Sequence, residues 1–152
     1  MRYLKLLFFF NLVFSLLSAQ DNESEIKNTV NSLFHSMKSS DGQGILSSFD
    51  SGATLKSVLK DSAGSTILKD EVISDFASSI AKLPKGYADE RITFELIKID
   101  GDLAFVWAPY ELYIGGKFKH CGVDAFTLVR KNNQWKITSL IDTRRKIGCK
   151  VN

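Results

Sequence analysis

Residues 118–126 read FKHCGVDAF, an alternation that is typical of a β-strand. One face of such a strand carries His120, Gly122, Asp124 and Phe126. A histidine and a carboxylate on the inner face of a sheet cost free energy unless they meet each other, a ligand or water. The sequence therefore predicts function on this face, and it favours a small-molecule pocket over a nucleic-acid or membrane surface.

The segments around this strand indicate an α+β fold. Tight-turn pairs at Asp100-Gly101, Gly115-Gly116 and Asn132-Asn133 separate strand-like runs over residues 91–99, 104–114, 117–130 and 135–142. Upstream, an apolar stripe predicts a helix over residues 24–38, and a second helix is expected between Asp70 and residues 83–86. A small hairpin is expected between the two helices, over residues 53–68. Helices followed by an antiparallel meander are expected to pack on one face of a strongly bent sheet.

The first 20 residues read as a signal peptide. A basic start with Arg2 and Lys5 precedes an apolar run over residues 6–17, and Ser18-Ala19-Gln20 supplies small residues for cleavage. The run is short for a membrane span, and no second apolar run follows it. We therefore expect an exported protein, periplasmic or secreted, with no stable membrane insertion and one domain over residues 21–152.

Composition excludes several classes of function. The formal net charge is +3, and Arg2 and Lys5 leave with the signal peptide, so the mature chain is close to neutral and has no basic stripe for nucleic acid. The sequence contains no glycine-rich phosphate loop, nucleophile elbow or paired metal motif. We therefore expect no cofactor and no metal; a single histidine between Glu111 and Asp124 does not indicate a transition-metal site.

Two-residue turns allow the strands to be paired by counting. Counting from Gly115-Gly116 places Glu111 opposite His120 and Trp107 opposite Asp124. Counting from Asn132-Asn133 places Asp124 opposite Ile141 and Phe126 opposite Ser139. The face that results is bulky and aromatic, and its candidate ligand-binding residues are Trp107, Glu111, Tyr113, His120, Asp124, Phe126 and Ser139.

The opposite face is flatter and made of smaller residues, so it suits a homodimer surface. Its members are Ala104, Val106, Ala108, Tyr110, Cys121, Val123, Ala125, Leu140 and Asp142. The chain has two cysteines, Cys121 and Cys149, and an even number in an oxidising compartment permits a disulfide. One disulfide and two free thiols therefore remain open alternatives.

These features resemble the nuclear-transport-factor-2-like superfamily, which includes the SnoaL-like cyclases and the ketosteroid isomerases. The resemblance rests on helices before a bent meander, with Trp135-Lys136-Ile137 on its last strand. Within the superfamily, residues 120–126 followed by DTRR at 142–145 and Gly148-Cys149 resemble the lumazine-binding family. The resemblance implies a cone-shaped, cystatin-like roll with a deep pocket, and that fold hosts both enzymes and binding modules.

Three functions remain open from the sequence. The favoured one is a non-catalytic protein that binds a small apolar or aromatic ligand, with polar contacts from His120, Asp124 and Glu111. The second is an isomerase, dehydratase or cyclase-like enzyme, for which His120 and Asp124 are the candidate catalytic residues. The third is a protein–protein interaction module that uses the flatter face. Against all three stands a purely structural role, in which His120 and Asp124 satisfy each other and hold the sheet in register.

Overall fold

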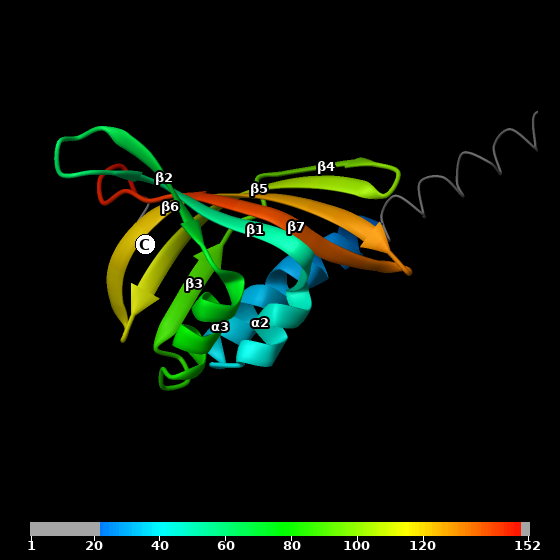
Figure 1. The fold of residues 1–152 in the computed structure, drawn as a ribbon, viewed down its shortest axis with the longest axis horizontal. Helices are drawn as coiled ribbons and strands as arrows, with labels where there is room; N and C mark the ends of the chain where they lie inside the picture. The colour runs from blue at the N-terminus through cyan, green and yellow to red at the C-terminus, as the bar shows by residue number, and fades with distance from the viewer. Residues whose placement is uncertain (1–21, 150–152) are drawn as a thin grey trace, which may run out of the picture.

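The computed structural model describes residues 22–149, which form helices packed inside one curved sheet (Figure 1). The predicted signal peptide lies outside the described residues. The elements are a helix over residues 22–38, α2 (Gly42–Ser48), β1 (Phe49–Lys60), β2 (Thr66–Glu71), α3 (Ile73–Ala81), β3 (Ala88–Ile92), β4 (Leu96–Asp100), β5 (Leu103–Ile114), β6 (Lys117–Lys131) and β7 (Gln134–Thr143). Within residues 22–149, every helix is too short or too polar to cross a bilayer.

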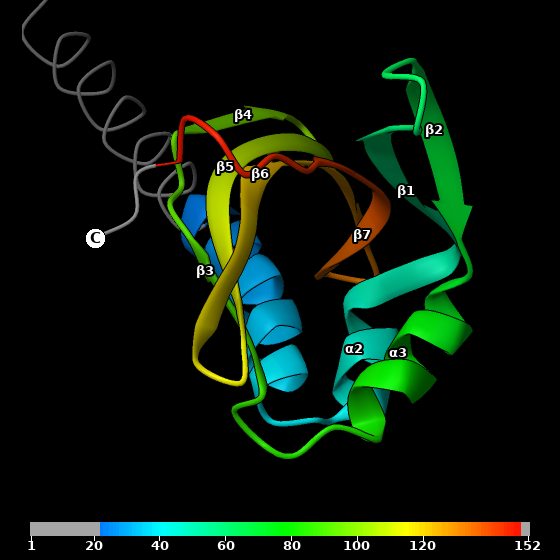
Figure 2. The same ribbon diagram turned by 90° about the vertical axis from the view of Figure 1, so that its left-hand side faces the viewer.

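The sheet has the strand order β2-β1-β7-β6-β5-β3. β3 pairs with the C-terminal half of β5, and β4 pairs with the N-terminal half of the same strand. All neighbours are antiparallel except β1 and β7, which run parallel. Figure 2 shows the sheet arching over the helix of residues 22–38, with α2 and α3 beside it. The predicted α+β cone fold is therefore confirmed, with a mixed sheet in place of a purely antiparallel one.

The helix of residues 22–38 forms because its apolar side chains recur at helical spacing and all face the sheet. The buried stripe is Ile26, Val30, Leu33, Phe34 and Met37. The ring of Phe34 packs edge-on against that of Phe126 on β6, with 6.1 Å between centroids. Such edge-to-face pairs add about 1 kcal/mol to the burial of the rings, so this contact fixes the helix to the centre of the sheet.

Two element boundaries differ from the sequence prediction. The run predicted at residues 91–99 is two strands, β3 and β4, which pair with opposite halves of β5. Asp70 does not cap the second helix, because it lies in β2 and pairs with Lys56. Val72 is the N-cap of α3 and offers no side-chain hydrogen bond. The hairpin of β1 and β2 is longer than expected, and the Asp61 carboxylate closes it by accepting from the backbone N–H groups of Ala63 and Ser65.

The predicted strand register is wrong, because each long hairpin contains a β-bulge. In the first hairpin, Tyr113 pairs with Phe118 but Leu112 pairs with His120, so Lys119 is an extra residue. In the second, Leu128 pairs with Ile137 but Thr127 pairs with Ser139, so Thr138 is extra. Compared with a count from the turn, an extra residue in one strand displaces every pairing beyond it by one position. The side chains of the partner strand that were predicted to face inward therefore face outward, and the reverse.

The correction reverses the predicted faces of β5. Ala104, Val106, Ala108 and Tyr110 point into the core, so most of the surface expected for a homodimer or a partner protein is buried, while Val123 and Ala125 on β6 are partly exposed. The outer face instead carries partly exposed apolar side chains on β4 and β5, namely Leu96, Leu103, Phe105 and Trp107.

Candidate functional site

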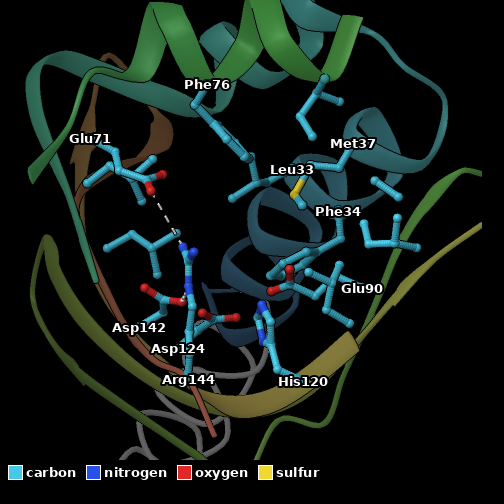
Figure 3. Close-up of a pocket in the computed structure, with 16 residues that line it drawn as sticks. Leu33, Phe34, Met37, Glu71, Phe76, Glu90, His120, Asp124, Asp142 and Arg144 are labelled. Carbon is cyan, nitrogen blue, oxygen red and sulfur yellow. Dashed lines mark hydrogen bonds and ion pairs between the residues drawn. The ribbon is translucent and has the colours of Figure 1, made fainter. Parts of the chain in front are cut away.

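A cavity of about 220 Å³ lies between the sheet and the helices. Its walls are apolar and come from the helix of residues 22–38, from α3 and from the inner faces of the strands. Its floor is polar (Figure 3). The apolar lining residues are Leu33, Phe34, Met37, Leu55, Phe76, Ile80, Ala88, Leu112, Ile114 and Leu140; the polar ones are Glu71, Glu90, His120, Asp124, Asp142 and Arg144.

Cross-strand pairing brings the polar floor together. Glu90 on β3 pairs with Leu112, which in turn pairs with His120 on β6. Asp124 on β6 pairs with Asp142 on β7, and Asp142 pairs with Ser57 on β1. The row of Tyr110 and Gly122 lies between these two rows, and because Gly122 has no side chain, the polar groups on either side of it converge beneath the apolar walls (Figure 3).

The Arg144 guanidinium is held at the edge of this floor. Its Nε donates to Asp142 Oδ2 at 2.6 Å, one terminal nitrogen donates to Ser57 Oγ at 2.7 Å, and the same nitrogen lies 3.7 Å from Glu71 Oε1. Ser57 is fully buried, so its hydroxyl fixes the guanidinium in one orientation. Arg144 therefore neutralises Asp142 and joins β1, β2 and β7 at one point.

A disulfide between Cys121 and Cys149, with 5.8 Å between Cα atoms, fixes the chain after β7. The backbone N–H and carbonyl groups of Cys121 and Arg145 also exchange hydrogen bonds of 2.9 Å. The segment that carries Arg144 is thus tied to β6 by covalent and hydrogen bonds. Of the two alternatives that the sequence left open, the structure has the disulfide.

Tyr110 links His120 to the carboxylates. Its hydroxyl lies 3.1 Å from His120 Nδ1, 3.2 Å from Asp142 Oδ2 and 2.9 Å from the Thr143 carbonyl oxygen. A hydroxyl has one proton to donate, and the carbonyl and the carboxylate can only accept. We therefore infer that His120 carries its proton on Nδ1 and donates it to Tyr110, which leaves Nε2 as an acceptor.

Burial changes the protonation of this floor. It raises the pKa of Glu90 to about 7, and the negative charge of Asp142 adds to the effect. Burial and the neighbouring Glu90 raise the pKa of Asp124 well above its ordinary value. Burial, followed by the positive charge of Arg144, lowers the pKa of His120. At neutral pH, burial therefore favours the protonated forms of Glu90 and Asp124 and the neutral form of His120.

Of the predicted ligand-binding residues, only His120 and Asp124 line the cavity. Phe126 faces the same side but lies in the core against Phe34. The remaining four lie outside the cavity because the bulges shift the register. Trp107 and Ser139 are on the outer face of the sheet. Tyr113 donates its hydroxyl proton to Glu111 Oε2 at 2.9 Å, away from the cavity. Glu111, His120 and Asp124 do not come together.

Sequence reasoning missed Glu90, Asp142 and Arg144. Glu90 lies in β3 between Ala88 and Ile92, and that short alternation was a signal for an inward-facing carboxylate. Asp142 was placed on the wrong face by the register. Arg144 lies two residues after Asp142 where the chain continues beside β6, so strand alternation brings it to the same inner face, but the predicted strand ended at Asp142.

The curved sheet wrapped around helices, with a cavity at its wider end, is the nuclear-transport-factor-2-like (NTF2-like) fold. A protein of this type from Novosphingobium aromaticivorans, described as having a cystatin-like fold, superposes with a TM-score of 0.71 at 12% identity, covering 91% of this chain and 90% of that one. An NTF2-like protein of unknown function from Shewanella baltica gives 0.63 at 18% identity, covering 82% and 94%. A cystatin-like protein of unknown function from Nostoc punctiforme gives 0.64 at 12% identity, covering 81% and 90%. No protein-family model and no curated protein sequence matches the chain.

Proposed function

We propose that this chain is an exported protein that binds one small, mostly apolar molecule in its cavity, without turning it over. The observation that carries the proposal is the cavity itself: apolar walls above a cluster of hydrogen-bonding groups. Small-molecule sites combine an apolar lining with a few convergent polar groups, which orient the ligand.

The cavity volume sets the size of the ligand. An apolar cavity of about 150 Å³ in another protein holds benzene. The 220 Å³ here accommodates one aromatic ring with a short substituent, oriented by the polar floor. The resemblance to the lumazine-binding family adds a compact bicyclic ligand to the set worth testing.

The test uses neutral probes and a variant that fills the cavity. Ligand-observed NMR with indole, benzamide, cyclohexanol and lumazine measures binding to the exported form of the protein. Leu112→Trp places a large ring in the cavity, and Leu96→Trp makes the same change on the outer face as a control. We expect at least one probe to bind to wild type and to Leu96→Trp but not to Leu112→Trp. Binding that survives in a folded Leu112→Trp, or that is absent from wild type, contradicts the proposal.

A second candidate function is an enzyme that moves a proton on a bound ligand, such as an isomerase or dehydratase. The observation that favours it is a carboxyl, Glu90, with a pKa of about 7 beside the neutral imidazole of His120. A group that titrates near the working pH is suited to general acid–base catalysis. Turnover of an identified ligand that is lost in both Glu90→Gln and His120→Asn, while binding persists, supports catalysis over binding alone.

Export and a homodimer are parts of the same proposal. Export is supported by residues 1–20 and by the disulfide, because disulfides persist in oxidising compartments. The mature N-terminus, read by mass spectrometry of protein recovered outside the cytoplasm, tests it. For a homodimer, the outer apolar side chains of β4 and β5 replace the buried face as the contact surface. Sedimentation of wild type and Trp107→Lys measures whether that surface associates.

A further inference from the structure

The cavity floor has more carboxyl groups than bases to neutralise them. Glu71, Glu90, Asp124 and Asp142 all line it, and the basic side chains among the lining residues that the structure describes are Arg144 and His120, of which burial favours the neutral form of His120. The contacts of that guanidinium go to Asp142, Ser57 and Glu71. Glu90 and Asp124 therefore face the cavity without a cationic partner.

Two buried carboxylate oxygens on this floor also lack a hydrogen-bond donor. Asp124 is 2% exposed and Asp142 is 7% exposed, and within residues 22–149 neither Asp124 Oδ2 nor Asp142 Oδ1 has a partner. Buried polar atoms are nearly always satisfied, by protein, water or ligand. Both carboxyls point into the cavity (Figure 3), so a molecule in the cavity is in position to supply the missing donors.

We propose that the ligand of this cavity is a small organic cation: a protonated amine on an apolar body of about one aromatic ring, with its ammonium group donating to Asp124 and Glu90. The inference rests on the proposed function, and it adds the chemical class of the ligand. The ammonium lies on the polar floor, and the ring lies between the side chains of Phe34, Met37 and Phe76. The two phenyl rings in this wall offer an apolar surface for the ring of the ligand.

The protonation of the floor supports a cationic ligand. Without a cation beside them, Glu90 and Asp124 favour their protonated forms, because burial disfavours both charges, the charge of Asp142 adds to the effect on Glu90, and the charge of Glu90 adds to the effect on Asp124. A cation between them reverses that balance, so binding releases protons. The other groups around the pair do not supply this charge: His120 is neutral, the pKa of Tyr110 is raised by burial, and Arg144 is held by Asp142 and Glu71.

Three probes of nearly the same shape test the charge preference: 2-phenylethylamine, 2-phenylethanol and phenylacetate. Calorimetric titration measures their affinities from pH 5.5 to 8.5, a range over which an alkylamine with a pKa of about 10 stays charged. We expect the amine to bind about tenfold more tightly than the alcohol at pH 8, and the carboxylate not to bind. Amine affinity falls as the pH drops below about 7, because protons then compete with the ammonium group for the carboxyl pair.

Two further measurements separate a cavity site from weak surface binding. Amine binding at pH 6 releases protons, which titrations in buffers of different ionisation enthalpy detect, whereas a cation on the exposed surface releases none. Asp124→Asn lowers amine affinity about tenfold and changes alcohol affinity by less than about threefold, since a hydrogen bond to a charged group contributes roughly this much. Asp100→Asn, at an exposed position, is the matched control. Glu90→Gln serves as a second variant if Asp124→Asn does not fold.

The outcomes distinguish this inference from the function on which it rests. If the alcohol or the carboxylate binds as tightly as the amine at pH 8, the cation inference is refuted and the binding function stands. If amine binding is indifferent to both Asp124→Asn and Glu90→Gln, the assignment of the ammonium to this carboxyl pair is refuted. If none of the three probes binds while a neutral probe such as indole does, the ligand class is again wrong and the cavity is still a binding site.

Discussion

Replacement of Glu90 by glutamine is expected to stabilise the protein increasingly as the pH rises from 4.5 to about 7, and not at pH 4.5 or below. Burial raises the pKa of this carboxyl from 4.5 to about 7 in the folded protein. A raised pKa contributes stability that is fully present below pH 4.5 and is lost as the pH rises through 7. One pKa unit corresponds to about 1.4 kcal/mol, so the free energy of unfolding falls by about 3 kcal/mol over this pH range. Glutamine keeps the shape and does not titrate, so it removes this loss.

Urea unfolding of wild type and Glu90→Gln at pH 4.5 and pH 8 measures the effect. At pH 4.5 the variant is expected to match wild type to within about 1 kcal/mol, because the glutamine amide keeps the shape and the hydrogen-bonding capacity of a protonated carboxyl. Between pH 4.5 and pH 8 the difference in the free energy of unfolding shifts by about 3 kcal/mol in favour of the variant. Glu95→Gln makes the same substitution on an exposed side chain and is the control. A difference that stays constant over this pH range refutes the assignment of a buried, proton-binding Glu90.

Three other predictions concern the surroundings of the cavity. Removal of the disulfide by Cys121→Ser with Cys149→Ser lowers the free energy of unfolding by about 3–4 kcal/mol, as expected for a closed loop with a sequence separation of 28; equal stability in urea contradicts it. Gly122→Ala costs about 3 kcal/mol or more, since the added Cβ lies 1.7 Å from the Thr143 carbonyl oxygen, and an unchanged thermal midpoint contradicts the close approach. In NMR titrations, His120 titrates below 6.5 because burial and Arg144 disfavour the imidazolium, and a midpoint above 6.5 means that the ring is not buried as described.

The fold was predictable because its signals are local. Apolar spacing gave the helix of residues 22–38, and turn dipeptides such as Gly115-Gly116 gave the long hairpins. Both depend on backbone geometry and on one buried face, which a short window of sequence contains. The parallel contact of β1 with β7 joins segments far apart in the chain, and no local pattern indicates it.

The site was only partly predictable. The inward alternation of His120 and Asp124 is visible within one strand, and both residues do line the cavity. Their partners depend on register, and counting from the turns cannot detect the extra residues Lys119 and Thr138. Arg144 reaches the cavity because the chain after β7 continues beside β6 in the same antiparallel register, with Cys121 opposite Arg145, so that Arg144 follows Asp142 on the inner face; the predicted last strand ended at Asp142.

The two bulges also affect how this protein can be compared with others and how it can change. A deletion of the single codon for Lys119 or Thr138 removes the bulge, leaves both turns intact and keeps Leu112 opposite His120 or Thr127 opposite Ser139. At the 12% to 18% identity seen with the structures compared above, a gap misplaced by one position would match pocket residues to surface residues. Alignments of this hairpin should be fixed at the bulges first and at the turns second.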